Sequence, residues 1–182
     1  MRPLCEKIKR TTLMRERASR ICGGQGGLTS APSKVSGERS MIERVVRASI
    51  KPVMIVSRTF AEPDHVVFAY DASPSAKRAL ERLANSPLFA GLPVTIVMAE
   101  ASVEAKAAAL KDAEAVFAPD HPVTTVFDPG KAKKVIPRVV ASAGNPLLLM
   151  GAYGHSPIRN LIVGSTITEM IRTTHAPVLL VR

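Results

Sequence analysis

Residues 65–85 read HVVFAYDASPSAKRALERLAN, an apolar run that passes into an amphipathic helical pattern. The run predicts a buried strand that ends at Asp71. Ser73 can cap the following helix, and Pro74 suits the first helical position. A strand that leads at once into a helix is typical of an α/β fold.

The same alternation continues along the rest of the chain. Apolar runs predict further strands at 52–56, 94–99, 122–127, 147–150 and 177–181, and helical patterns predict helices at about 42–49, 103–116, 132–142 and 166–174. Pro137 predicts a kink or a late start for the helix at 132–142. Strands that are apolar on both faces need helices on both sides, so we predict an α/β class with a doubly wound, five-stranded parallel sheet of Rossmann-like type.

In such a sheet, ligands bind beyond the carboxyl ends of the strands, where the strand order reverses. The loops that follow Asp71, Ala99, Phe127 and Met150 are therefore the candidate places for chemistry.

The charge of the chain is unevenly distributed. The 182 residues carry a net charge of +10, and residues 1–36 hold eight Lys or Arg against two acids. This segment also contains a glycine cluster at 23–27, which predicts a flexible basic arm. A solvated tail is one interpretation, and affinity for nucleic acid or an anionic surface is the other. Aromatic residues are not interleaved with the basic ones, so we do not expect a nucleic-acid partner.

Neither a membrane nor redox chemistry is expected. No apolar run approaches the roughly 18 residues that span a bilayer, and the basic N-terminus is not followed by the apolar region of a signal peptide. Cys5 and Cys22 lie in the basic arm and support neither a disulfide framework nor a zinc site. We therefore expect a cytoplasmic protein without a membrane partner.

A short internal repeat indicates how the chain is organised. Residues 42–56, IERVVRASIKPVMIV, align without gaps on residues 167–181, ITEMIRTTHAPVLLV, and the offset is about one domain length. We predict a flexible arm at 1–36, the last helix and strand of a truncated first domain at 37–58, and a complete second domain at 64–182. Chance similarity between two amphipathic segments is the alternative.

The motif most relevant to binding follows the strand at 147–150. Two residues separate Gly151 from Gly154, and nine separate Gly154 from Gly164, which precedes Ser165. Glycines let a backbone pass close to a ligand, and the N–H groups at a helix N-terminus favour an anion. A phosphate site is the hypothesis, and a turn with an ordinary helix cap is the alternative.

This spacing, with MGAYGHS at 150–156, resembles the nucleotide motif of the ATP-binding universal stress proteins, and the resemblance covers about residues 37–182. It implies an adenine nucleotide alpha hydrolase-like fold that binds ATP, with or without Mg²⁺. Asp71 and Gly151 would contact the ribose, the glycine–serine motif the phosphates, and backbone at the end of the second strand the adenine. The implied binding positions are Asp71, Ala72, Met98, Ala99, Asp128, Met150, Gly151, Gly154, His155, Gly164, Ser165 and Thr166. His155 could instead cap the turn or face solvent.

The resemblance implies a nucleotide-binding module of the stress response. A slow ATPase or autokinase is a second hypothesis, because Ser156, Ser165 and Thr166 offer hydroxyls, although no general base is evident. A nucleotide-free interaction protein of the same fold is a third. Family members pair through their last strands, so we expect a homodimer or, within one chain, pairing of 52–56 with 177–181. No catalytic and no metal-binding residue is predicted.

Overall fold

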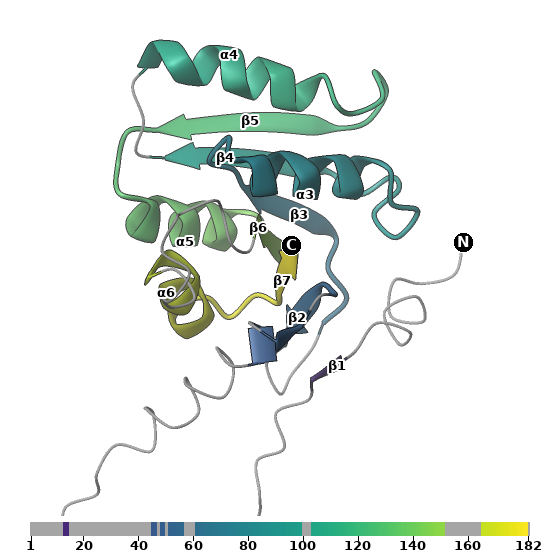
Figure 1. Cartoon of the computed structure of the whole chain (residues 1–182), viewed down its shortest axis with the longest axis vertical. Helices are drawn as coiled ribbons and strands as arrows, with labels where there is room; N and C mark the ends of the chain where they lie inside the picture. Colours follow the sequence, from purple (N-terminus) through teal and green to yellow (C-terminus); the bar gives the residue numbers. More distant parts are fainter. Residues whose placement is uncertain are drawn as a thin grey trace, which may run out of the picture.

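A seven-stranded sheet forms the middle layer of the molecule (Figure 1), in a computed structural model that describes residues 13–14, 45–46, 48–49, 51–56, 61–99, 103–151 and 165–181. Across the sheet the strands follow the order β1-β2-β7-β6-β3-β4-β5. Their bounds are Leu13–Met14 (β1), Val53–Ile55 (β2), His65–Ala69 (β3), Val94–Ala99 (β4), Val123–Asp128 (β5), Pro146–Gly151 (β6) and Val178–Val181 (β7). The five strands from β7 to β5 run parallel to one another.

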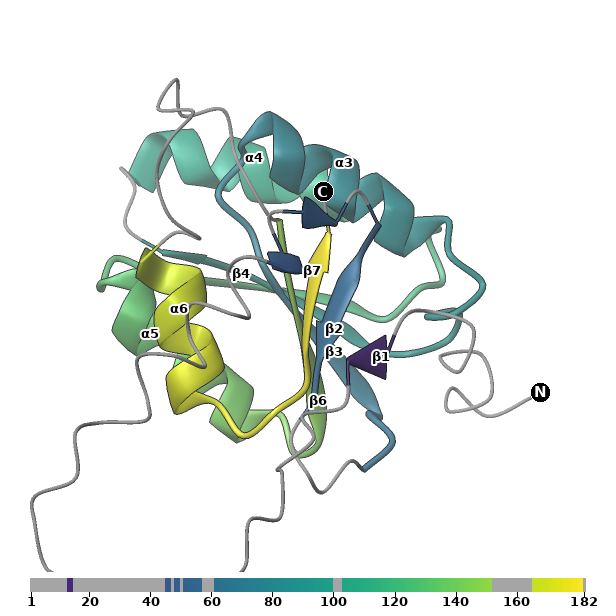
Figure 2. The same cartoon turned by 60° about the horizontal axis from the view of Figure 1, so that its bottom comes forward.

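Helices cover both faces of this sheet (Figure 2). Helices α3 (Pro74–Ala84) and α4 (Val103–Glu114) lie on one face, and α5 (Ala132–Ser142) and α6 (Ser165–Thr173) lie on the other. In β3, Val66 and Phe68 belong to the core under α3 and α4, whereas Val67 belongs to the core under α5 and α6. Successive side chains of a strand point to opposite faces, so β3 must be apolar throughout.

The predicted doubly wound α/β fold with five parallel strands is confirmed. The strand at 94–99 and the helix at 132–142 have the predicted bounds. Helix α5 begins at Ala132 and contains Pro137, so the alternative of a late helix start is wrong. Within the predicted helix at 42–49, Val45, Val46 and Ala48 are helical and Ser49 is not, whereas positions 42–44 and 47 lie outside the described residues.

The two strands of the internal repeat pair with each other, as expected. Strand β2 is antiparallel to β7, and Val53, Met54 and Ile55 face Leu180, Leu179 and Val178 in that order. In the repeat, Met54 corresponds to Leu179, so the pairing is centred on two equivalent residues. A local twofold axis therefore relates β2 to β7.

Strand β1 extends the same symmetry. It lies parallel to β2, as β6 lies parallel to β7, and Leu13 faces Met54 as Leu149 faces Leu179. We expected no strand within residues 1–36. A strand of two residues leaves no periodic pattern by which a sequence could reveal it.

At the start of β3, a partly buried histidine bonds to the neighbouring strand. His65 Nε2 lies 2.8 Å from Thr95 Oγ1 of β4. Burial lowers the pKa of His65 below its ordinary value, and the nearby carboxylate of Asp64 opposes this shift only in part. The folded protein therefore disfavours protonated His65.

We predict that His65 destabilises the protein in mild acid. Its pKa is lower in the folded protein than in the unfolded chain, so the unfolded chain binds the proton first as the pH falls. The His65 contribution to the free energy of unfolding should be constant above about pH 6.5 and should decline as the pH falls from there toward the folded-state pKa. Urea denaturation between about pH 8 and about pH 5 measures this. The variant His65→Gln should lose part of the pH dependence, and equal slopes for the two proteins would contradict the prediction.

Candidate functional site

The carboxyl ends of β3 and β6 meet where the strand order reverses. From β3 the chain adds β4 and then β5 on one side, and it places β6 on the other side. Ala69 of β3 faces Met150 of β6, and the chain leaves the two strands toward Asp71 and beyond Gly151. In a doubly wound sheet, this divergence of two loops creates a crevice for a ligand.

A tight turn fixes Asp71 between β3 and α3. Its Oδ1 accepts a hydrogen bond of 3.0 Å from the backbone N–H of Ser73, and Ser73 Oγ accepts one of 3.2 Å from the N–H of Ala76. The second bond is the predicted helix cap. The Asp71 side chain is exposed, and its Oδ2 has no partner among the described residues. This oxygen can accept hydrogen bonds from a ligand.

The same turn has an unusual backbone conformation. Ala72 has a φ of 58°, and no other non-glycine residue in the described part of the chain has a positive φ. The left-handed region costs an L-residue with a Cβ roughly 1–2 kcal/mol. The turn that fixes Asp71 is therefore strained.

Gly151 is required by packing between β6 and α3. A Cβ added at this position would lie 3.2 Å from both the Cα and the backbone N of Ala76. These are backbone atoms in the first turn of α3, and they have little room to shift. Absence of a side chain at Gly151 thus lets the end of β6 touch the start of α3, beside the turn that carries Asp71.

The end of β4 leaves backbone groups beside the crevice. Ala69, the last residue of β3, faces Val97, so β4 continues two residues farther. The carbonyl of Val97 accepts a hydrogen bond of 2.9 Å from the N–H of Tyr70, and alternate residues of a strand direct their N–H and C=O to the same side. The backbone groups of Ala99 therefore face the space beyond the end of β3. Met98 lies opposite Phe127 of β5, and its side chain is buried.

Two other predicted site residues have partners within the protein. Asp128 Oδ1 accepts a hydrogen bond of 2.7 Å from the N–H of Gly130, and its Oδ2 forms an ion pair with Arg138 of α5. The Asp128 carboxylate therefore holds the loop between β5 and α5, two strands away from β3. The Met150 side chain is buried in the core under α5 and α6, so only its backbone is available at the edge.

The predicted phosphate contacts are described only in part. Helix α6 begins at Ser165, and Thr166 in its first turn is half-buried. This helix connects the carboxyl end of β6 to the amino end of β7, so its N-terminus lies on the side of the sheet that carries Asp71. Gly154, His155, Ser156 and Gly164 lie outside the described residues.

Sequence reasoning did not select Tyr70, which adjoins the crevice. Burial raises the pKa of the Tyr70 phenol, and the carboxylates of Asp112 and Asp71 raise it further. The side chain packs near Phe68, with ring centroids 5.8 Å apart. Tyr70 therefore remains a neutral core residue at neutral pH, and only its place next to Asp71 could have drawn attention to it.

Comparison with known proteins places this fold in a family. Residues 88–182 match the sequence model of the Universal stress protein family. Over 144 residues, or 78% of this chain and half of the relative, the sequence is 38% identical to universal stress protein Slr1230 of Synechocystis. The structure is similar to a universal stress protein from Archaeoglobus fulgidus, with 25% identity, a TM-score of 0.60, and coverage of 72% of this chain and 49% of that one. It also resembles UspA from Lactobacillus plantarum, with 20% identity, a TM-score of 0.51, and coverage of 67% and 100%.

A doubly wound α/β sheet with a crevice at its switch point defines a Rossmann-like protein. This chain belongs to the universal stress protein family, and that membership supports a role in the response to stress. The chain spans about half the length of the Synechocystis and Archaeoglobus relatives. In the described part of the chain, no helix has both the length and the apolar character needed to cross a membrane.

We predict that Gly151→Ala destabilises the fold. The added Cβ would meet backbone atoms of Ala76 at 3.2 Å, and overpacking of this kind costs about 1–3 kcal/mol. Urea denaturation measures the change in the free energy of unfolding. An unchanged urea concentration at the midpoint of unfolding would contradict the prediction, because it would show that β6 and α3 can move apart without loss of stability.

We predict the opposite effect for Ala72→Gly. Glycine adopts a positive φ without strain, and after its greater loss of backbone entropy is included the net stabilisation should be about 0.5–1 kcal/mol. The matched variant Ala72→Val should destabilise the protein, because a β-branched side chain is poorly accommodated in the left-handed region. Thermal denaturation of the three proteins gives the order, and a less stable glycine variant would contradict the prediction.

Proposed function

We propose that this chain binds an adenine nucleotide such as ATP at the carboxyl edge of β3, β4 and β6, as a nucleotide-binding module of the stress response. The observation that carries the proposal is the arrangement around the switch point. There, the Asp71 carboxylate, the backbone of Ala99 and the close-packed Gly151 all lie at the carboxyl ends of neighbouring strands, which is where a doubly wound sheet binds its ligand. Membership of the universal stress protein family supports it.

Two of these groups suit the nucleoside. Adenine has ring nitrogens that accept hydrogen bonds and an amino group that donates them. The C=O and N–H of Ala99, which face the space beyond β3, could pair with both kinds of group. The ribose hydroxyls are donors, and an acidic side chain at the end of a neighbouring strand is a common partner for them in Rossmann-like folds. Asp71 Oδ2 fits this role because Oδ1 is already held by Ser73.

The phosphates would lie toward the start of α6. The N-terminus of a helix favours an anion, and the N–H groups in the first turn of α6 and the hydroxyl of Thr166 are available there. The glycine motif at Gly154 and Gly164 supports the same assignment from sequence alone. Among the described residues, no three His, Cys, Asp or Glu side chains converge on a metal position. Mg²⁺ bound with a nucleotide usually keeps several waters and is held by substrate phosphates and one or two carboxylates, so we propose that any Mg²⁺ here would be held mainly by phosphate oxygens and water.

The variant Asp71→Asn tests the ribose contact. Asparagine keeps an oxygen that can accept the N–H of Ser73, so the turn should survive while the charge is lost. The affinity for ATP, measured by titration calorimetry, should fall about tenfold or more, as expected for a hydrogen bond to a charged group. Asp64→Asn is the matched control, because this exposed acid lies at the opposite end of β3. Equal affinities for the two variants would exclude Asp71 from the site.

A second experiment tests whether a nucleotide binds at all. Protein purified and then denatured should release an adenine nucleotide, and folded Gly154→Val and Gly164→Val variants should release none. If the wild-type protein is empty and added ATP produces neither heat nor a thermal shift, the proposal is wrong. A nucleotide-free interaction protein of the same fold would then be the better interpretation. Phosphate release during incubation with ATP separates a binding protein from a slow ATPase or an autokinase.

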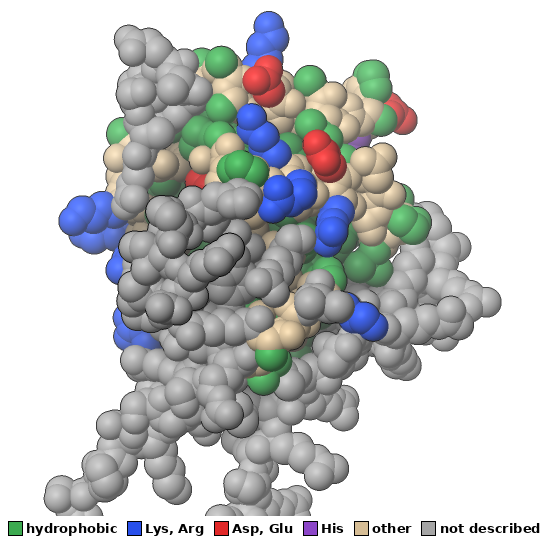
Figure 3. Space-filling model, viewed as in Figure 1, with side chains coloured by type: hydrophobic (Ala, Val, Ile, Leu, Met, Phe, Trp, Pro, Cys, Tyr) green, Lys and Arg blue, Asp and Glu red, His purple; other side chains and the backbone are tan. Residues whose placement is uncertain are grey.

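The pairing of β2 with β7 also affects whether a second copy of the chain can bind. Strand β2 occupies the edge of β7 through which a second chain could pair. We propose that pairing within the chain replaces a homodimer at this edge. On the face seen in Figure 3, basic side chains stand among acidic and hydrophobic ones, which gives no reason to propose a nucleic-acid partner. The cytoplasm remains the predicted location.

A further inference from the structure

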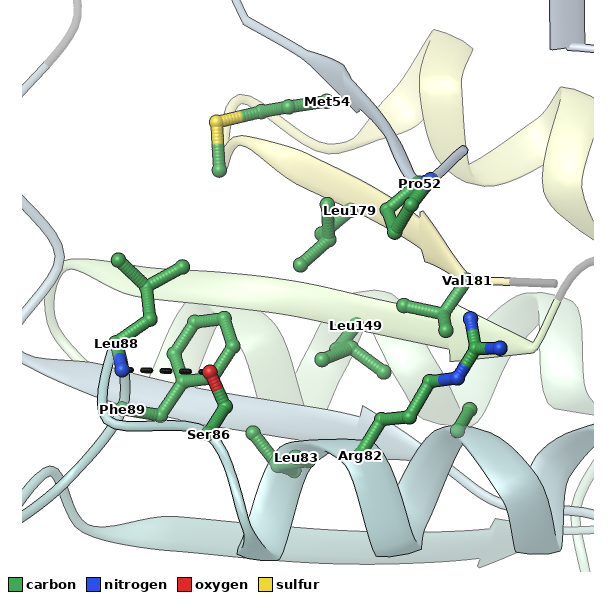
Figure 4. Close-up of a pocket in the computed structure, with 11 residues that line it drawn as sticks. Pro52, Met54, Arg82, Leu83, Ser86, Leu88, Phe89, Leu149, Leu179 and Val181 are labelled. Atoms are coloured by element: carbon green, nitrogen blue, oxygen red, sulfur yellow. Dashed lines mark hydrogen bonds between the residues drawn. The ribbon is translucent and has the colours of Figure 1, made fainter. Parts of the chain in front are cut away.

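A cavity lies between α3 and the β2–β7 pair (Figure 4). Its volume is about 150 Å³, and its walls come from α3, the turn after α3, and the strands β2, β6 and β7. Buried apolar side chains form most of the lining, notably Met54, Leu83, Phe89, Leu149, Leu179 and Val181. Asp71, Ala99 and Gly151 do not contribute to it. The cavity is therefore separate from the carboxyl-edge site.

One positively charged side chain, that of Arg82, lines this apolar cavity. Arg82 is an exposed residue in the last turn of α3, and in Figure 4 its guanidinium points toward Val181 at the end of β7. Arg82 forms no ion pair with any described residue, and no Asp or Glu belongs to the lining. The other polar side chain of the lining is Ser86, whose Oγ accepts a hydrogen bond of 3.3 Å from the N–H of Leu88. Among the described residues, the cavity thus combines an apolar lining with one positive charge, that of Arg82.

We propose that this cavity binds a medium-chain alkyl carboxylate. The alkyl chain would replace water against Leu83, Phe89 and Leu179, and the carboxylate would accept two parallel hydrogen bonds from the guanidinium of Arg82. The guanidinium fork matches a carboxylate in geometry, whereas a neutral or cationic head group would not gain this pairing. A cavity of about 150 Å³ holds a molecule of benzene size, so a chain of about six to eight carbons is the expected length.

Titration of the full chain with hexanoate and octanoate, followed by NMR, tests this proposal. Signals from Leu88 and Val181 should shift in a saturable manner. Each added methylene that enters the cavity should tighten binding about fourfold. Octanol and octylamine serve as neutral and cationic ligands of matched length, and both should bind more weakly than octanoate.

Two variants separate the head-group contact from the cavity itself. Arg82→Gln should weaken octanoate by up to about fivefold, because the guanidinium is exposed to solvent, and should leave octanol nearly unchanged. Arg78→Gln is the matched control, because Arg78 lies one turn earlier on α3 and does not line the cavity. Leu88→Trp places a larger side chain at the half-buried mouth, and it should reduce the binding of every ligand.

Several results would overturn the proposal. Failure of octanoate to give a saturable shift would do so, and so would binding of octanoate to Leu88→Trp that is as tight as binding to the wild-type protein. An equal loss of octanoate and octanol in a folded Arg82→Gln variant would show that the guanidinium does not recognise the carboxylate. A second copy that covers Leu88 and Val181 and excludes octanoate would identify the face as a protein interface instead. The proposal does not depend on nucleotide binding.

Discussion

The parallel pairing of β3 with β6 is the constraint on which the rest of the structure depends. These strands lie side by side although β4 and β5 come between them in the chain, and their five paired positions bring Ala69 next to Met150. With β4 on one side of β3 and β6 on the other, the connections must place helices on both faces to remain right-handed. The loops after the two strands then turn away from each other. The place where a doubly wound sheet binds its ligand therefore follows from the strand order.

The elements of this fold could be predicted because their signals are local. Strand β4 is apolar on both faces, and Ser73 with Pro74 marks the start of α3 through the chemistry of a helix cap. Strand β1 could not be predicted, because only its partner β2 defines its two residues as a strand. Pro137 shows a further limit of local reasoning. The sequence indicated a disturbed helix at 132–142, but the packing of Val135 and Ile136 against the core favours a helix that begins before the proline.

Some features of the candidate site could likewise be predicted from the sequence, and others depend on tertiary structure. Sequence spacing placed Asp71 and Gly151 at strand ends, and the topology brings those ends together. The strain at Ala72 could not be predicted, since alanine gives no signal of a positive φ. The sequence suggested that Gly151 lets the backbone pass close to a ligand, but it could not show that a side chain there would collide with α3. The atoms that exclude a side chain belong to Ala76, which is far from Gly151 in the sequence. The ion pair of Asp128 with Arg138 depends on the direction that α5 takes after its loop, and this too is a tertiary property.

The position of β7 has a consequence for how the chain acquires its structure. It is the last strand of the sheet in chain order, yet it lies in the interior, between β2 and β6. Until β7 docks, β2 and β6 each present an unpaired edge, and such edges can template pairing with other chains. The contacts between β2 and β7 join residues 123 to 127 positions apart, as in the pair Ile55 and Val178 and the pair Val53 and Leu180, so they form late and are costly in loop-closure entropy. Assembly of this protein on the ribosome should therefore be vulnerable just before β7 docks, and a chaperone that shields strand edges would be most useful at that stage.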